Sequence, residues 1–485
     1  MTPLLEQAYD PEIFRKQAHQ LIDQITDHLT RCFSKTEPQV LQWRNPAELR
    51  DKWHKILSVE IDQNQFWEET IHDTIHLHHP HYMGHQVSPA LPLAGLGELI
   101  NGTLNNGSAI YEMGPVSSSM ESVVIQWLAE AMGFNSDASG FLTSGGSLGN
   151  FTALLAARQV QSGYNHWREG LREGFHPAIM VSEEAHYSIA RAVQMMGWGE
   201  QGLVKVPVNN NHQIDTQQLE PLLRKSLSEG KQVIILVGNA CSTATGSYDP
   251  LKPMAEFAER HHLWFHVDGA HGAAAAITPK YRHLTEGINR ADSVVIDFHK
   301  MMGASALTTA VLFKDGANSY ATFDQDAGYL LNHGGNDPWY DSAMRTVECT
   351  KNMMGIKIFA ILKTYGPQFF IDYFTSCYDL GRTFAEIIKQ TDDFDLATEP
   401  MSNIVCFRYH PENIPGDPQH EPDELNRMNR KIRRQLLEEG KFYIVQTKIG
   451  EAFYFRTSLM NPFTTSEDLK LLLDEIRIKA KNYLS

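Results

Sequence analysis

The sequence predicts an α/β protein built around a mostly parallel sheet, and two observations indicate this class. Short apolar runs such as 263–267 and 293–296 end abruptly in polar or glycine residues, which is typical of buried parallel strands. Helix-forming segments, such as 151–158, lie elsewhere in the chain. A chain of 485 residues suits one large α/β unit with smaller appendages.

Bulk composition excludes several classes of partner. The formal net charge of −16 argues against nucleic acid or an anionic membrane surface. No apolar run reaches the ~18 residues of a membrane-spanning helix, and residues 1–10 lack the features of a signal peptide. The five cysteines are scattered without paired spacing, which is typical of a reduced protein without a metal site. We therefore expect a cytoplasmic location.

Two of the apolar runs end in residues that can carry chemistry. Asp268 ends the first run, and Lys300 follows the second. In open α/β sheets, ligands bind beyond the carboxyl ends of the strands, so both side chains are expected at one crevice. The pair alone could form an ordinary salt bridge.

A Gly/Ser turn upstream provides the third part of a site. Residues 141–150, Phe-Leu-Thr-Ser-Gly-Gly-Ser-Leu-Gly-Asn, lead into the helix former 151–158. Free N–H groups and the helix dipole attract anions to such a turn, although many of these turns are plain caps. Pyridoxal phosphate (PLP) needs a lysine for a Schiff base, a carboxylate at its ring nitrogen and a phosphate cradle. The three segments together predict PLP.

The same segments resemble the PLP-dependent group II amino acid decarboxylases. The family motif Asn/Asp-X-His-Lys is matched by 297–300, and His-Val-Asp-Ala-Ala-X-Gly is matched by 266–272 with Gly269 in place of the first alanine. The resemblance extends from about residue 78 to residue 462. It implies the PLP-dependent transferase fold (fold type I), an amino acid substrate, and a homodimer with the active site near the subunit interface.

The resemblance also implies roles for single residues. Lys300 would carry PLP, Asp268 would bond its ring nitrogen, and His186 would stack on its ring. A hydroxyl near the ring oxygen is implied for the pair Ser242 and Thr243, with Ser242 as the cofactor-binding candidate, and a plain turn is the alternative. The residues implied to hold the phosphate are Gly146, Ser147 and His299.

A histidine cluster at 78–85 invites a metal. Its spacing repeats no helical or hairpin ligand geometry. The family has a similar segment that lines the entrance of the active site without metal. We therefore expect no metal here and take His81 as a substrate-binding candidate.

The region from 323 to 351 is rich in glycine, asparagine and aromatic residues, which favours a loop that covers a site. The family uses a loop tyrosine to return a proton to the product carbon, and Tyr340 is a better candidate than Tyr329. Many members then carry an arginine for the substrate carboxylate where this chain has Lys351. An ammonium keeps the charge but loses the bidentate fork.

Three domains are expected. Residues 1–95 form a helical segment that packs at the dimer interface or, alternatively, within its own subunit. Residues 96–374 form the large PLP-binding domain, and 375–485 form a small C-terminal α/β domain with two strands separated by a charged helix.

The substrate signals conflict. Asp297 in the lysine motif is similar to the diaminobutyrate branch, whereas Met301-Met302-Gly303 is more like the glutamate and cysteine sulfinate branch. A small acidic amino acid (aspartate, glutamate or cysteine sulfinate) is favoured, with 2,4-diaminobutyrate next. The alternatives are an oxygen-dependent aldehyde synthase and an aminotransferase or lyase of the same fold.

Overall fold

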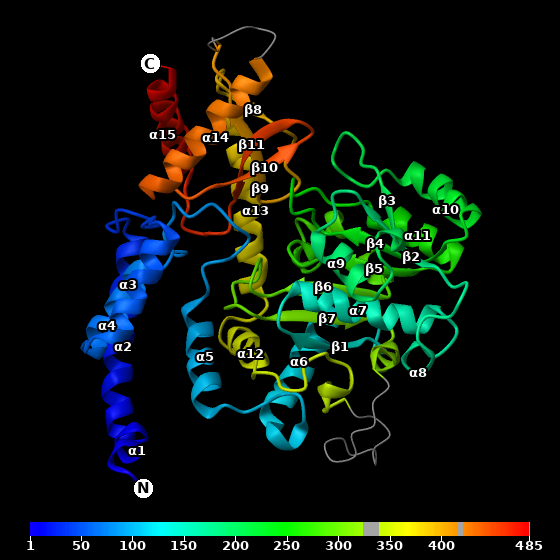
Figure 1. Cartoon of the computed structure of the whole chain (residues 1–485), viewed down its shortest axis with the longest axis horizontal. Coiled ribbons are helices and arrows are strands. Elements are labelled where there is room, and N and C mark those ends of the chain that lie inside the picture. The colour runs from blue at the N-terminus through cyan, green and yellow to red at the C-terminus, as the bar shows by residue number, and fades with distance from the viewer. Residues whose placement is uncertain (324–338, 413, 415–420, 485) are drawn as a thin grey trace. The chain divides into compact units, whose positions relative to one another are not determined.

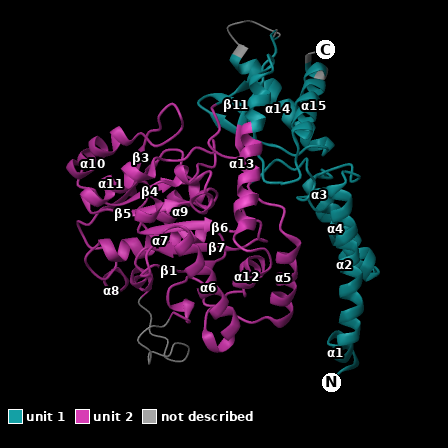
Figure 2. Ribbon diagram, turned by 180° about the vertical axis from the view of Figure 1, so that it is seen from behind, with its two compact units in different colours: residues 1–85, 383–397, 406–485 teal, residues 86–382, 398–405 magenta. Residues whose placement is uncertain are grey.

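The computed structural model describes residues 1–323, 339–412, 414 and 421–484. These residues form two compact units (Figure 2). Unit 1 comprises 1–85, 383–397 and 406–485, and unit 2 comprises 86–382 and 398–405. The N-terminal helices therefore share a unit with the C-terminal residues. The three-part division expected from the sequence stays a prediction.

A seven-stranded sheet forms the centre of unit 2 (Figure 1), in the order β1-β7-β6-β5-β4-β2-β3. Neighbouring strands among β6, β5, β4, β2 and β3 pair in parallel, whereas β7 is antiparallel to both of its neighbours, β1 and β6. This confirms the predicted α/β class with a mostly parallel sheet. The strands are β1 (Ser139–Thr143), β2 (Pro177–Ser182), β3 (Leu203–Val206), β4 (Gln232–Asn239), β5 (Trp264–Asp268), β6 (Ser293–Asp297) and β7 (Thr309–Phe313).

Helices flank this sheet. Helix α7 packs against β4 to β7, and α10 and α11 contact β4. A Cβ placed on Gly149 of α7 would come within 3.2–3.3 Å of three side chains of the sheet, so the glycine permits the close approach. The helices are α5 (Pro92–Leu104), α6 (Pro115–Ala131), α7 (Gly146–Gln161), α8 (His166–Glu169), α9 (Tyr187–Met195), α10 (Leu219–Ser228), α11 (Leu251–His261), α12 (Gly355–Tyr365) and α13 (Gln368–Lys389), which continues into unit 1.

The strand ends place the polar residues of the site. Because β4, β5 and β6 are parallel, their last residues Asn239, Asp268 and Asp297 lie at one edge of the sheet. Asn239 stands opposite Asp268 in the register. Strand β2 ends at the same edge and leads into His186, which caps the N-terminus of α9.

Unit 1 combines N-terminal helices with a four-stranded sheet of order β10-β11-β9-β8. The amide of Val40 donates to the carbonyl of Gly440 at 2.7 Å, and Lys35 pairs with Asp468 at 2.6 Å, so the N-terminal segment packs on C-terminal residues of its own chain. The elements are α1 (Pro3–Ala8), α2 (Pro11–Phe33), α3 (Pro46–Ser58), α4 (Gln63–Asp73), β8 (Phe394–Leu396), β9 (Ile404–Tyr409), α14 (Glu421–Glu439), β10 (Val445–Ile449), β11 (Ala452–Ser458) and α15 (Ser466–Leu484).

None of the helices in the described ranges combines the length and the apolar character needed to cross a membrane.

Candidate active site

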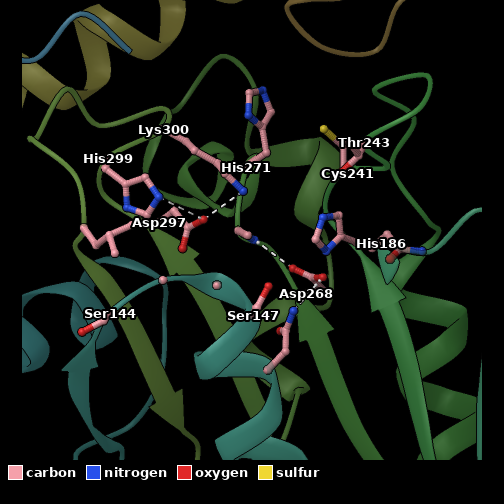
Figure 3. Close-up of a pocket in the computed structure, with 16 residues that line it drawn as sticks. Ser144, Ser147, His186, Cys241, Thr243, Asp268, His271, Asp297, His299 and Lys300 are labelled. Atoms are coloured by element: carbon pink, nitrogen blue, oxygen red, sulfur yellow. Dashed lines mark hydrogen bonds and ion pairs between the residues drawn. The ribbon is translucent and has the colours of Figure 1, made fainter. Parts of the chain in front are cut away.

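A cavity of about 280 Å³ opens at the carboxyl ends of the parallel strands in unit 2 (Figure 3). The residues expected from the sequence that line it are Gly146, Ser147, His186, Asp268, His299 and Lys300. Its lining also includes Thr243, whose hydroxyl the resemblance implies near the ring oxygen together with that of Ser242. Residues to which the sequence assigned no role line it as well, among them Asn150, Asn239, Cys241, His271 and Asp297.

Lys300 enters the cavity from the turn after β6. Its Nζ lies 2.9 Å from Oδ2 of Asp297, three residues earlier (Figure 3). The Asp297 carboxylate also accepts the hydroxyl of Thr309, and Nε2 of His299 lies 3.6 Å away. The lysine is therefore held as one half of an ion pair at the floor of the site.

The ion pair determines the charge of both groups. Burial would raise the pKa of Asp297, but the charges of Lys300 and His299 outweigh it and hold that pKa below its usual range. Burial would likewise lower the pKa of Lys300, but the Asp297 carboxylate outweighs it and raises that pKa. Both shifts favour an ammonium facing a carboxylate in the chain alone.

Asp268 is the second carboxylate of the cavity and ends β5. Its Oδ2 accepts a hydrogen bond from Nδ2 of Asn150 at 2.9 Å, and its Oδ1 accepts the amide of Ala270 at 3.3 Å. The residue is 6% exposed. Neutral donors thus support Asp268, in contrast to the charged neighbours of Asp297.

His186 lies beside Asp268 in the cavity (Figure 3). Its Nδ1 contacts Oγ of Ser188 at 2.8 Å and accepts the Ser188 amide at 3.3 Å. Burial lowers its pKa, and although the charge of Asp268 opposes this, the net shift is downward. A neutral imidazole held at one edge by the start of α9 suits stacking on a flat ring.

The N-terminus of α7 has the features of an anion site. Gly145 precedes the helix with φ of +112°, a conformation strained for any residue with a side chain. No side chain of the described residues caps this terminus, so the helix dipole and the first N–H groups face the cavity. Gly146, Ser147 and the nearby His299 line this part of it.

Four expected site residues, Ser242, Tyr340, Lys351 and His81, are not among the described residues that line the cavity. Ser242 lies in the turn after β4, where its Oγ accepts the amide of Ala244 at 3.3 Å, whereas its neighbours Cys241 and Thr243 do line the cavity. Tyr340 packs its ring against Tyr111 and Trp339.

Tyr329, the other tyrosine considered for the proton donor, lies outside the described residues.

Lys351 is committed elsewhere in unit 2. Its Nζ lies 2.6 Å from Oε1 of Glu121 on α6 and donates to the carbonyl of Leu142 on β1 at 2.8 Å. The lysine side chain is 0% exposed and that of Glu121 is 6% exposed. It is not among the described cavity-lining residues, and its ammonium ties α6 to β1.

His81 lies in unit 1. Its Nε2 contacts Oδ1 of Asp468 at 3.0 Å, and its ring stacks on Phe442 with 4.1 Å between centroids. Burial lowers its pKa and outweighs the hydrogen bond with Asp468. The expectation that it binds substrate stays a prediction.

Within the part of the chain that the structure describes, no group of three or more histidine, cysteine or acidic side chains is arranged to hold a metal ion.

The cavity fits PLP on three counts: a lysine amine, a buried carboxylate supported by neutral donors, and a helix N-terminus without a side-chain cap from the described residues. A fold of this kind with these groups defines a PLP-dependent enzyme. Residues 38–410 match the family model described as the pyridoxal-dependent decarboxylase conserved domain. The chain therefore belongs to the pyridoxal-dependent decarboxylases, and it is a PLP-dependent amino acid decarboxylase.

Similar proteins agree with this family. L-2,4-diaminobutyrate decarboxylase of Acinetobacter baumannii is 28% identical over 440 residues, covering 88% of this chain and 84% of that relative. Cysteine sulfinic acid decarboxylase of Mus musculus is 29% identical over 457 residues, covering 91% of each chain. The crystal structure of mouse CSAD superposes with a TM-score of 0.89 at 26% identity, covering 97% of this chain and 99% of that one.

Proposed function

We propose that the enzyme removes the α-carboxyl group of a small acidic L-amino acid, namely cysteine sulfinate, aspartate or glutamate, to give the amine and CO2. The observation that carries the reaction class is the meeting of Lys300, Asp268 and the N-terminus of α7 in one cavity. The acidic preference is supported by the similarity to mouse cysteine sulfinic acid decarboxylase. It is also supported by Met301-Met302-Gly303 after the lysine.

Each cavity group has one task in this proposal. Bound PLP supplies a conjugated ring that takes up the electrons released with CO2. Lys300 is the point of covalent attachment. Asp268 keeps the ring nitrogen protonated, because a neighbouring negative charge favours the charged form. His186 stacks on the ring and limits its tilt. The first turn of α7 and His299 hold the phosphate.

Roles further from the cavity floor rest on the family resemblance. We retain Tyr340 as the donor of the proton that returns to the α-carbon, Ser242 as a hydroxyl near the ring oxygen, and His81 as a substrate contact. We assign Lys351 to the scaffold, because its ammonium is already paired with Glu121.

Decarboxylation of 2,4-diaminobutyrate is the second candidate. It is favoured by the Acinetobacter baumannii relative and by the carboxylate of Asp297, where the family motif also allows asparagine. The two candidates differ in the sign of the distal charge on the substrate.

The test is a product assay on PLP-loaded enzyme with cysteine sulfinate, aspartate, glutamate and 2,4-diaminobutyrate. CO2 and the matching amine in equal amounts identify the substrate. Peroxide and ammonia alongside CO2 would instead indicate an aldehyde synthase, and turnover that requires a keto acid would indicate an aminotransferase.

Lys300→Ala is the matched loss-of-function variant, with Lys314→Ala at an exposed lysine of the same unit as its control. The first should abolish turnover and the second should leave it unchanged. Normal turnover in Lys300→Ala would refute the assignment of the site.

We also propose that the chain forms a homodimer, as the family resemblance implies. In support, α5 exposes Leu96, Leu99 and Leu104, which are 49%, 42% and 62% exposed in the single chain. Light scattering at micromolar concentration tests the assembly, and a mass of one chain would contradict it.

A further inference from the structure

Asn150 lies on the second turn of α7 and is 1% exposed. Its Nδ2 donates to Oδ2 of Asp268 at 2.9 Å and to Oγ of Ser188 at 3.1 Å. Its Oδ1 lies 3.0 Å from Nε2 of His266. One buried amide thus contacts Asp268 directly and also contacts Ser188, which in turn bonds His186.

The chemistry of these partners fixes the amide's orientation. A flipped amide would bring its oxygen against the Asp268 carboxylate, where two acceptors would repel each other. In the orientation present, both amide hydrogens are used and the oxygen accepts from His266. The Asn150 amide therefore has a single orientation that satisfies all three of its partners while Asp268 is ionised.

A chain of donors extends away from Asn150 into the sheet. Nε1 of Trp264 donates to Oγ of Ser293 at 2.8 Å, and that oxygen lies 2.8 Å from Nδ1 of His266. Because Oδ1 of Asn150 can only accept, Nε2 of a neutral His266 carries the proton, and its Nδ1 accepts the hydroxyl of Ser293. The donors run from Trp264 through Ser293, His266 and Asn150 to Asp268.

A second arm leads to His186. Ser188 Oγ accepts from Asn150 and lies 2.8 Å from Nδ1 of His186; because Nδ1 also accepts the Ser188 amide and so carries no proton, the hydroxyl donates to it. Nδ1 of His186 also accepts the Ser188 amide. That nitrogen is therefore an acceptor only, and a neutral His186 carries its proton on Nε2.

We propose that Asn150 is a positioning residue that sets the hydrogen-bonding state of both groups facing the cofactor ring. Its amide supplies a permanent donor to Asp268, which keeps this carboxylate oriented and available to the protonated ring nitrogen. By donating to Oγ of Ser188 it orients the hydroxyl that bonds Nδ1 of His186, and His266 holds the amide in place. This inference rests on the proposed role of Asp268, and it adds the residues that orient the Asp268 carboxylate for that role.

The test compares two cofactors on the apoprotein: PLP, and its 1-deaza analogue with carbon in place of the ring nitrogen. Only PLP can use Asp268, whereas both compounds use Lys300, the phosphate cradle and His186. The ratio of the two dissociation constants therefore isolates the ring-nitrogen interaction. Asn150→Leu and Asn150→Ala should lower the preference for PLP by about tenfold or more, the range for a lost hydrogen bond to a charged group.

Controls separate positioning from packing. Thr152→Val alters a buried residue of the same helix whose hydroxyl donates to the Leu148 carbonyl and has no other bond to the residues that the structure describes. It should keep the wild-type preference. Ser188→Ala should weaken both cofactors alike, because stacking does not depend on the ring nitrogen. Should the Asn150 variants not fold, His266→Leu should lose the preference and His266→Gln, whose amide can still donate to Asn150, should restore it.

Equal weakening of both cofactors in the Asn150 variants, with the preference unchanged, would overturn the inference while leaving the proposed function standing. A wild-type protein without preference for PLP over the deaza analogue would overturn the role of Asp268 itself and the inference with it.

Discussion

Lys351 offers the sharpest test of how the scaffold is held, because sequence and structure suggest different roles for it. The ammonium is fully buried and has two partners, Oε1 of Glu121 at 2.6 Å and the carbonyl of Leu142 at 2.8 Å. The same Glu121 oxygen accepts the Leu142 amide at 3.0 Å. Lys351→Met keeps most of the apolar stem and removes only the charge.

The expected loss follows from what the substitution leaves behind. Removing one partner of a buried ion pair strands the other charge, which costs about 3–5 kcal/mol. Adding Glu121→Gln to Lys351→Met removes the stranded charge and keeps an acceptor for the Leu142 amide. The double variant should therefore recover part of this loss, with a coupling of roughly 0.5–3 kcal/mol. Lys351→Arg should not be neutral either, since overpacking a closed site costs about 1–3 kcal/mol.

Urea unfolding of the wild type, both single variants and the double variant at equal PLP saturation measures these free energies, and KM and kcat are taken on the same preparations. We expect loss of stability in Lys351→Met with KM changed less than threefold. A KM raised tenfold or more with unchanged stability would refute the scaffold role and restore Lys351 as a substrate-binding residue.

Three further predictions concern the site and its sheet. Asp297→Asn removes the charge that raises the pKa of Lys300, so the apoprotein should capture PLP faster at neutral pH in stopped-flow absorbance, and an unchanged rate would contradict this. Burial chiefly lowers the pKa of His266 to about 4, against about 6.5 in an unfolded chain, so the unfolded chain takes up the proton first as the pH falls. The free energy of unfolding should therefore fall by up to about 3 kcal/mol from pH 6.5 to 4, and this fall should be smaller in His266→Gln. Gly149→Val should cost about 1–3 kcal/mol in urea unfolding because a Cβ there already lies 3.2–3.3 Å from the sheet, whereas Gly102→Ala, with open space around it, should cost nothing.

The parts of the site that lie at strand ends were accessible from the sequence. A buried strand shows itself as an apolar run, and the first polar residue after it must lie at the edge of the sheet. This is why Asp268 and Lys300 could be brought to one cavity without coordinates. The glycines at the start of α7 could be placed for the same reason, since a turn before a helix former has one end that attracts anions.

The remaining parts depend on contacts between distant segments. Asn150 occupies an ordinary helical position, and its partners Asp268 and His266 lie 118 and 116 residues away in the chain. Lys351 stands where many family members carry an arginine, yet its ammonium is paired with Glu121, 230 residues earlier in the chain. Unit 1 likewise joins Val40 to Gly440. The local pattern of the sequence does not predict such contacts between distant residues.

The two carboxylates of the cavity show why these distant contacts matter for the chemistry. Asp297 forms an ion pair with Lys300, which compensates its charge, and Nε2 of His299 lies 3.6 Å from the same carboxylate. Asp268 receives neutral donors from Asn150 and Ala270, so its negative charge is oriented but not cancelled. Only a carboxylate of the second kind can hold a proton on a pyridine nitrogen, because an already neutralised one would offer it little attraction. The neutral donors at Asp268 and the paired ammonium at Asp297 therefore distinguish two residues that the sequence presents alike, each as an aspartate at the end of a buried strand.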